Sequence, residues 1–232
     1  MSYELDDDWL IIRDMTLVDE VIDLPNVRQW VIIQSVIQGV TFKNVKAENF
    51  SFGAGMRPTT YRNCVFSDCE IRSITPGRAT FVGCTFENVD LFRLIFREVE
   101  MVDCTFSGVM KDVVFDRRVQ ASDRIKLGRI ENIYSGNDFS RVKLIDVSFR
   151  GGVQLDAQIL PVGDGYIYIA DAERELPKLI ENVRVADPES RLLTYLKVCL
   201  DHVDGGQRSV LLSPYDRARR GKAGELLANL YP

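Results

Sequence analysis

A five-residue period across residues 79–109 constrains this chain more than any other feature. A small or aliphatic residue is followed two positions later by a large apolar one, and the remaining positions are mostly polar. The large position holds Phe81, Phe86, Leu91, Phe96, Met101 and Phe106, and the small position holds Ala79, Cys84, Val89, Leu94, Val99 and Cys104. Neither the helical period nor strand alternation gives this pattern over thirty residues. A fixed period of this kind indicates a repeat architecture.

The pattern extends in both directions. Upstream, in an earlier phase, the large position holds Ile12, Leu17, Ile22, Val27, Ile32, Ile37, Phe42, Ala47 and Phe52. Residues 53–58 contain two Gly and one Pro, which predicts a turn or bulge where the phase slips by one. The pattern is expected to stop where Lys111 takes a large position, and it returns at Phe139, Leu144 and Phe149. We therefore expect a repeat domain over 1–155 with an inserted loop at about 111–131.

This spacing resembles the pentapeptide-repeat family, whose loose consensus is a small residue, Asp or Asn, Leu or Phe, and two variable residues. The resemblance implies a mainly β fold, a right-handed quadrilateral β-helix solenoid with four five-residue sides per coil. Residues twenty apart would then stack in neighbouring coils at about 4.8 Å. The expected ladders are Phe66, Phe86 and Phe106; Tyr61, Phe81 and Met101; and Cys64, Cys84 and Cys104.

The composition changes after Asp156, and residues 156–232 are expected to form a β-hairpin and a small α-helical cap. The hairpin would turn at 162–165, and helices would cover 171–185, the residues after Asp187-Pro188, and Ser213 to about Leu230. The ends of a stacked repeat need covering, which gives this region a role. Helical C-terminal segments often form dimers in the family, so the resemblance implies a homodimer through these helices.

No cluster of residues suggests catalysis, a cofactor or a metal site. Four of the five Cys occupy the small position, which favours buried reduced thiols, and no CxxC or His pair accompanies them. The single His, His202, is expected near the C-terminal end of a helix, where its interaction with the helix dipole is favourable. Gly163-Asp-Gly165 lacks the Lys-Ser/Thr of a phosphate loop. A β-helix enzyme such as a polysaccharide lyase would show clustered acids or bases, so we expect no enzyme.

The sequence shows neither the pattern of a signal peptide nor that of a membrane span. The first eight residues are acidic and lack the basic and apolar regions of a signal peptide, and no run approaches the roughly 18 apolar residues of a membrane span. We therefore expect a cytoplasmic protein that does not bind membranes.

The stretch 116–129 interrupts the repeat and is basic. It carries Arg117, Arg118, Arg124, Lys126 and Arg129 against Asp116 and Asp123. These five basic residues are the candidate protein-binding site, because such a loop can contact an acidic protein face or phosphate. The alternative is a solvated charged insertion. Direct nucleic-acid binding is not expected, because the whole chain has a net charge of −5.

The function that follows is a non-enzymatic protein-binding module of adaptor, inhibitor or immunity type. The resemblance offers an alternative, a DNA mimic that binds DNA gyrase or topoisomerase IV and protects against quinolones or toxins. A mimic needs a strongly negative face, but residues 27–115 hold ten basic and nine acidic side chains. The acidic excess lies in residues 1–26, with eight acids and one base, and segregation between faces could still produce an acidic side.

Overall fold

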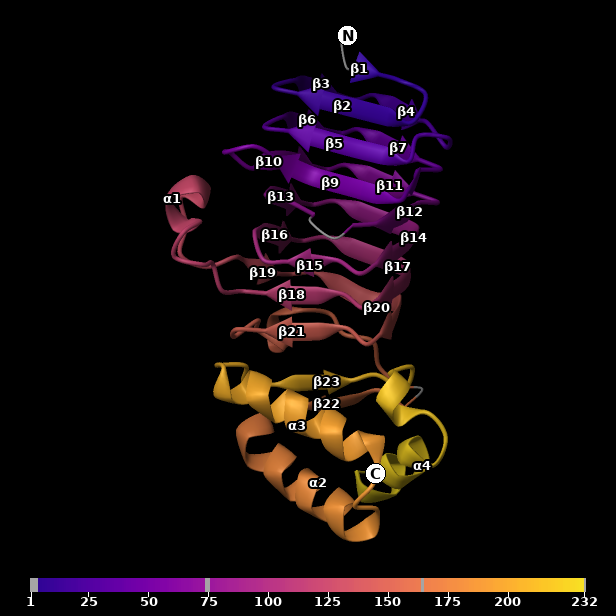
Figure 1. The fold of residues 1–232 in the computed structure, drawn as a ribbon, viewed down its shortest axis with the longest axis vertical. Helices are drawn as coiled ribbons and strands as arrows, with labels where there is room; N and C mark the ends of the chain where they lie inside the picture. The colour runs from indigo at the N-terminus through magenta and orange to yellow at the C-terminus, as the bar shows by residue number, and fades with distance from the viewer. Residues whose placement is uncertain (1–3, 74–75, 164, 232) are drawn as a thin grey trace.

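The computed structural model describes residues 4–73, 76–163 and 165–231. These residues form a rod of stacked parallel strands, one end of which is covered by helices (Figure 1). The N-terminus lies at the far end of the rod, and the C-terminus lies among the helices. This arrangement confirms the expected fold class, a mainly β solenoid with a small C-terminal helical region.

The strands of the solenoid belong to four sheets, and every pair is parallel except β1 with β2. The first sheet contains β1 (Glu4–Leu5), β2 (Trp9–Arg13), β5 (Gln29–Ile33) and β9 (Asn49–Ala54). The second contains β3 (Thr16–Val18), β6 (Val36–Gln38), β10 (Thr59–Arg62), β13 (Ala79–Val82), β16 (Val99–Val102) and β19 (Tyr134–Ser135).

The third sheet wraps around a corner of the rod. It contains β4 (Val21–Asp23), β7 (Thr41–Lys43), β11 (Val65–Ser67), β14 (Thr85–Phe92), β17 (Thr105–Lys111) and β20 (Asp138–Ile145), with β8 (Lys46–Ala47) and β12 (Glu70–Arg72) on the adjoining side. The fourth contains β15 (Ile95–Phe96), β18 (Val114–Asp116) and β21 (Ser148–Arg150).

The register of these strands shows a twenty-residue coil. Tyr61 pairs with Phe81, and Phe81 pairs with Met101. Phe66 pairs with Phe86, and Phe86 pairs with Phe106. The pentapeptide-repeat β-helix expected from the sequence is therefore confirmed.

The corners of the coils depend on residues in the left-handed backbone region. Among the residues that the structure describes, eleven that are not glycine have φ between 48° and 56°, and all but Gln34 and Arg93 are Asp or Asn. Each of the corner residues Asn63, Asp68 and Asn88 lies two positions after a buried central residue. Asp and Asn tolerate this conformation better than other side chains. The fifth position of the repeat therefore sets the turns of the coil.

The core is built from ladders of like side chains. Phe42, Phe66, Phe86, Phe106 and Phe139 stack in one row with ring centroids 4.7, 4.8, 4.9 and 5.0 Å apart. These distances follow the spacing between hydrogen-bonded strands. Stacked aromatic pairs also gain free energy beyond the burial of their area. The predicted ladder is confirmed, and it extends one coil further at each end.

The repeat does not stop at Lys111 as expected. Met110 fills the core position, and Phe115 fills the next one. The register shifts because Gly108 pairs with Val89, so this coil is one residue shorter. Gly108 has φ 104°, and a Cβ atom there would lie 2.5 Å from the Val89 carbonyl oxygen. Only glycine allows the two backbones to approach this closely.

Two loops leave the solenoid. Residues 55–58 connect β9 to β10, and residues 117–133 connect β18 to β19. The second loop contains a short helix, α1 (Arg124–Leu127). The solenoid strands therefore continue through Asp116, beyond the start predicted for the insertion.

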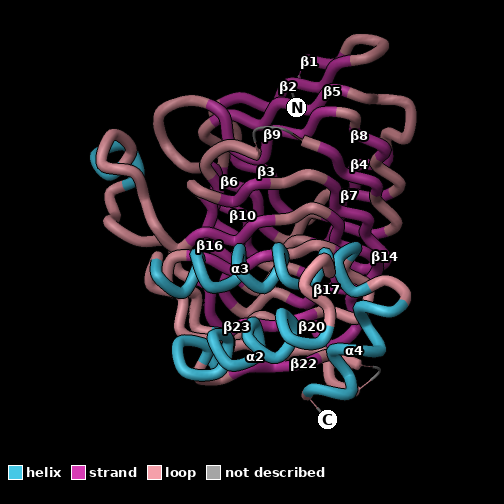
Figure 2. Tube along the Cα trace, turned by 60° about the horizontal axis from the view of Figure 1, so that its bottom comes forward, coloured by secondary structure: helices cyan, strands magenta, loops and turns pink. Residues whose placement is uncertain are grey.

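The C-terminal region is a cap with its own apolar cluster. It contains η1 (Leu155–Ala157), β22 (Ile167–Ile169), α2 (Ala172–Ala186), α3 (Arg191–Asp204), β23 (Val210–Leu212), η2 (Arg217–Arg219) and α4 (Lys222–Leu230). Figure 2 shows α2, α3 and α4 together across one end of the rod. None of the helices in the described ranges is long and apolar enough to cross a membrane.

The cap differs from the sequence expectation at two points. In place of the hairpin, β22 pairs antiparallel with β23. The segment expected to form the first hairpin strand instead adds to the solenoid, because Ile159 accepts from Phe139 N and donates to Asn137 O. Asp164, in the predicted turn, lies outside the described residues.

The second difference concerns helix boundaries. The helix predicted over 171–185 is confirmed, with Asp171 as its N-cap. Asp187 is not the next N-cap but follows the end of α2, and Ser190 caps α3 through a bond from Leu192 N. The last predicted helix is divided into η2 and α4.

Candidate protein-binding edge

The loops 55–58 and 117–133 project from the same edge of the solenoid (Figures 1 and 2). We call these two loops together the two-loop edge. The guanidinium of Arg78 lies between them. It donates to the carbonyl oxygen of Gly55 in the short loop and lies 3.5 Å from Asp123 Oδ1 in the long loop. It also lies 3.1 Å from Glu98 Oε2 of the underlying coil. One side chain thus fixes both loops to the rod.

A second ion pair holds the base of the long loop. Arg129 Nη1 lies 3.2 Å from Glu100 Oε2, and the exposed fractions of these side chains are only 14% and 13%. Arg129 also donates to Asn132 Oδ1 and to the carbonyl oxygen of Glu98. Burial lowers the pKa of Arg129, and Glu100 acts in the opposite direction. Removing either partner would leave a largely buried charge without its counterion.

The C-terminal end of the long loop is hydrogen-bonded directly to the solenoid. The buried amide of Asn132 donates to the carbonyl oxygens of Arg97 and Asp116, at 2.7 and 2.8 Å. Glu100 Oε1 accepts from the backbone N–H of Ile133. The loop therefore leaves and rejoins the rod at defined points.

The short loop is fixed in the same manner. Gln34 Oε1 accepts from the backbone N–H groups of Met56 and Arg57, at 3.0 and 3.1 Å. Below the loop, Gly53 and Gly77 bridge two coils, and a Cβ on Gly53 would lie 1.6 Å from the Arg78 carbonyl oxygen. The two glycines thus allow the backbones of these neighbouring coils to approach closely.

Most of the basic residues predicted as the binding site have carboxylate partners within this chain. The pairs are Arg117 with Glu131 at 2.7 Å, Arg118 with Asp116 at 2.9 Å, Arg129 with Glu100, and Lys126 with Asp123 at 3.7 Å. Arg124, on α1, is exposed and makes no ion pair with any residue in the described ranges. The structure thus gives most of these charges a role in holding the loop.

Sequence reasoning missed the apolar side chains of the two-loop edge. Ile125 is 93% exposed at the tip of the long loop, and Ile130 and Ile133 are also exposed. Met56 on the short loop is 60% exposed. The available signal was three isoleucines in a polar stretch that has no five-residue register. Clustered exposed apolar residues mark interaction sites more often than scattered ones do.

The flat faces of the rod are mixed in character. On the second sheet, the outward positions of β10, β13 and β16 are Thr60, Arg62, Thr80, Val82, Glu100 and Val102. On the third sheet, those of β7, β11 and β12 are Thr41, Lys43, Val65, Ser67, Glu70 and Arg72. These strands therefore present no continuous row of carboxylates.

The side chains that could carry chemistry are dispersed or buried. No group of three or more His, Cys, Asp or Glu in the described ranges could hold a metal ion. All five Cys are free and buried. Burial raises the pKa of Cys69 to about 11, and the hydrogen bond with Cys104 raises the pKa of Cys84 to about 12. At neutral pH Cys69 and Cys84 are therefore thiols, which are weak nucleophiles.

Comparisons with solved structures find structural neighbours of this chain, but the sequence comparisons find no relative. No family model matches the sequence, and no curated protein matches it significantly. The fold is similar to that of trypsin-treated QnrB1, described as a plasmid-mediated fluoroquinolone resistance protein. That match has 15% identity and a TM-score of 0.20, and it covers 65% of this chain and 79% of the other. By the register of its own coils, this chain folds as a β-helix with a five-residue repeat.

Proposed function

We propose that this protein is a non-enzymatic protein-binding module and that its two-loop edge contacts the partner. The observation that carries the proposal is the exposure of Ile125 and Met56 on loops that Arg78 holds against the rod. A flexible charged insertion would not need such fixation. Loops already held in one arrangement lose less conformational entropy when a partner binds.

The chemistry of the edge indicates the kind of surface it fits. Ile125 stands between Arg124 and Lys126, and the exposed Arg57 follows Met56. Apolar side chains can enter pockets on the partner, while basic side chains around them favour an acidic rim. We therefore expect a folded protein with an apolar pocket bordered by carboxylates.

The non-enzymatic reading is supported by the surroundings of the single histidine. His202 lies near the end of α3, and the nearest thiol on that helix belongs to Cys199. Burial raises the pKa of Cys199 to about 12, which disfavours a thiolate nucleophile. The five free thiols suit the reducing cytoplasm. Self-association through the C-terminal helices stays a prediction.

Partner capture with matched variants tests the proposal. Purified protein would be used to capture partners from lysate of its own organism, followed by quantitative mass spectrometry. Ile125→Asp and Met56→Asp should each deplete the same partner at least about tenfold, the effect of losing roughly 1.4 kcal/mol of binding free energy. Val162→Asp is the control, because Val162 is 88% exposed but lies in the cap.

Other results would overturn the two-loop edge as the binding site. A partner captured equally by wild type and both loop variants would place binding elsewhere. If that partner were gyrase or topoisomerase IV, and substitution of Asp6, Asp7 and Asp8 released it, the DNA-mimic alternative would replace the loop proposal.

A further inference from the structure

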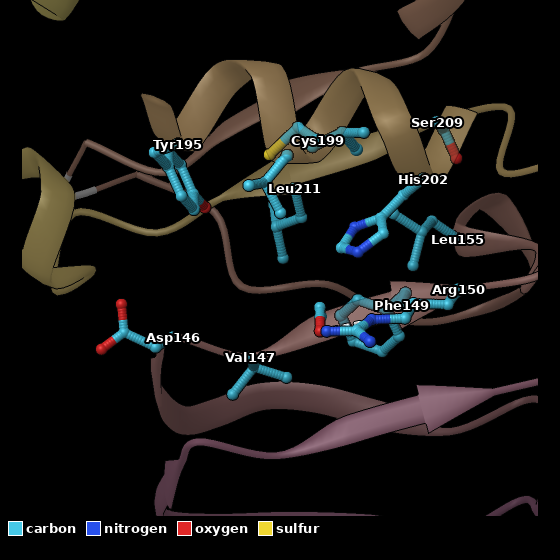
Figure 3. A pocket seen from close by; sticks show the side chains of 13 residues that line it. Asp146, Val147, Phe149, Arg150, Leu155, Tyr195, Cys199, His202, Ser209 and Leu211 are labelled. Carbon is cyan, nitrogen blue, oxygen red and sulfur yellow. Dashed lines mark hydrogen bonds between the residues drawn. The ribbon is translucent and has the colours of Figure 1, made fainter. Parts of the chain in front are cut away.

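A cavity of about 210 Å³ lies between the last coil of the solenoid and the cap. Its floor is formed by β21 and its roof by α3 (Figure 3). The walls are mainly apolar and include Val147, Phe149, Leu155, Val198, Cys199 and Leu211. A chamber of about 150 Å³ admits a benzene ring, so this one has room for about ten non-hydrogen atoms.

One end of the cavity holds the guanidinium of Arg150. Asp116 is the strand neighbour of Arg150, since the two residues pair in the register of β18 and β21. The Asp116 carboxylate, however, is taken by Arg118, which donates to both of its oxygens at 3.0 and 2.9 Å. Arg150 bonds only the neutral hydroxyl of Ser148 and forms no ion pair with the residues that the structure describes. A positive charge is thus left facing the cavity.

The imidazole of His202 lines the same end of the cavity (Figure 3). Burial lowers the pKa of His202, and the charge of Arg150 lowers it further. The other charges that act on it are Asp201, Arg118 and Asp116, of which only the two carboxylates raise its pKa. The imidazole is therefore neutral at neutral pH. An anion placed between it and Arg150 would raise the pKa of His202 and favour its protonation.

The opposite end of the cavity has no unmatched charge. Asp146 lies there, and its carboxylate accepts from the side chain and the backbone N–H of Arg217. The Tyr195 hydroxyl donates to Asp216. The cavity is therefore apolar along its length and positive at one end only.

We propose that this cavity binds a small monocarboxylate with an apolar body, whose carboxylate lies between Arg150 and His202. An anion at this position would pair with Arg150, whose strand neighbour Asp116 is already bonded to Arg118. The apolar body of the ligand would contact the wall residues. Medium-chain fatty acids and aromatic acids share this chemistry. The proposal does not depend on the two-loop edge.

Proton NMR of the single histidine gives a direct test. His202 is the only imidazole in the chain, so one resonance reports on the site. The pH titration of this resonance would be recorded alone and with sodium octanoate, sodium benzoate, octanol or sodium acetate. The pKa of His202 should rise with octanoate or benzoate and should not change with octanol or acetate. The acid that acts at lower concentration distinguishes an aliphatic from an aromatic ligand.

Variants distinguish a specific carboxylate-binding site from a nonspecific apolar cavity. Calorimetry should show octanoate or benzoate binding about tenfold more weakly to Arg150→Gln, because a charge-assisted hydrogen bond is lost. Arg141→Gln, which changes an exposed arginine on β20, should bind like wild type. Val198→Phe should block binding by filling the rim while both basic groups remain, which keeps the test valid if Arg150→Gln does not fold.

Three outcomes would overturn the proposal. The first is no measurable binding of either acid to the wild-type protein. The second is equal affinity for octanoate and octanol, which would make the cavity a nonspecific apolar void. The third is unchanged acid binding in both Arg150→Gln and Val198→Phe.

Discussion

The solenoid and the cap bury their apolar residues in different ways. In the solenoid, Phe86 stacks between Phe66 and Phe106, and the same contact recurs from coil to coil. In the cap, side chains from α2, α3 and α4, such as Leu176, Leu196 and Leu227, are buried in one cluster. Stability in a repeat array comes from contacts between nearest neighbours. We therefore expect that a destabilising substitution in one coil lowers the stability of the neighbouring coils, whereas one in the cap lowers the stability of the cap alone.

The two regions meet through hydrogen bonds and through Leu211 of the cap, which belongs to the apolar cluster of the solenoid. Gln207 donates to the carbonyl oxygen of Val153 and accepts from Gly152 N. Ser213 donates to the carbonyl oxygen of Leu144, and Asp216 accepts from Asp146 N. The cavity lies between these contacts. The junction is thus specific in its bonding but incompletely packed.

The largest expected effect breaks the ladder. Phe86→Ala should cost about 3–5 kcal/mol, because the buried ring stacks on both sides and cannot be replaced by its neighbours. Urea unfolding followed by circular dichroism measures this loss. A variant with the wild-type midpoint would show that the ladder does not carry the stability of the solenoid.

The matching change in the cap is Leu196→Ala. Leu196 is fully buried in the cap cluster, so we expect a loss of about 2–5 kcal/mol. Hydrogen exchange should show the loss in α2 and α3, with the amides of β11 and β14 still protected. Loss of protection throughout the solenoid would mean that the two cores unfold as one.

Much of the solenoid could be predicted from the sequence because its contacts repeat every twenty residues. The ladders and the coil register follow from the five-residue period together with the four-sided coil that the family resemblance implies. The Asp and Asn residues at the corners are visible in the sequence too, but their left-handed backbone is seen only in the structure. The two-loop edge could not be predicted, because Arg78 and Asp123 are brought together from 45 residues apart. The pairing of β22 with β23 is likewise a contact between distant segments with no repeating signal.

A smaller effect is expected at the junction. Asp216 is buried and accepts from Tyr195 Oη, Ser213 N and Asp146 N. Asp216→Ala leaves these donors without a partner and should cost about 1–3 kcal/mol at neutral pH, measured by urea unfolding.

The pH dependence of this variant sharpens the assignment. Burial raises the pKa of Asp216, so the folded state holds its proton more tightly than the unfolded state does. That contribution is full below the unfolded pKa and is lost as the pH rises through the folded pKa. The difference between wild type and Asp216→Ala should therefore be larger in acid than at neutral pH. A difference that falls on acidification would contradict the raised pKa.

The smallest expected effect on stability is at the tip of the two-loop edge. Ile125→Asp changes a side chain that is almost fully exposed, so the free energy of unfolding should change by less than about 0.5 kcal/mol. Thermal unfolding beside Val162→Asp would check this. A large loss would mean that Ile125 supports the fold and is not free to bind a partner.

Site-specific photo-crosslinking tests the central claim most directly. A photoreactive amino acid would be placed at position 125 or 56 in the two-loop edge and, as a control, at position 162 in the cap, in the organism's own lysate. The account predicts that the same partner protein is crosslinked from positions 125 and 56 but not from 162. Crosslinking of that partner from 162 alone, or equally from all three positions, would contradict binding through the two-loop edge.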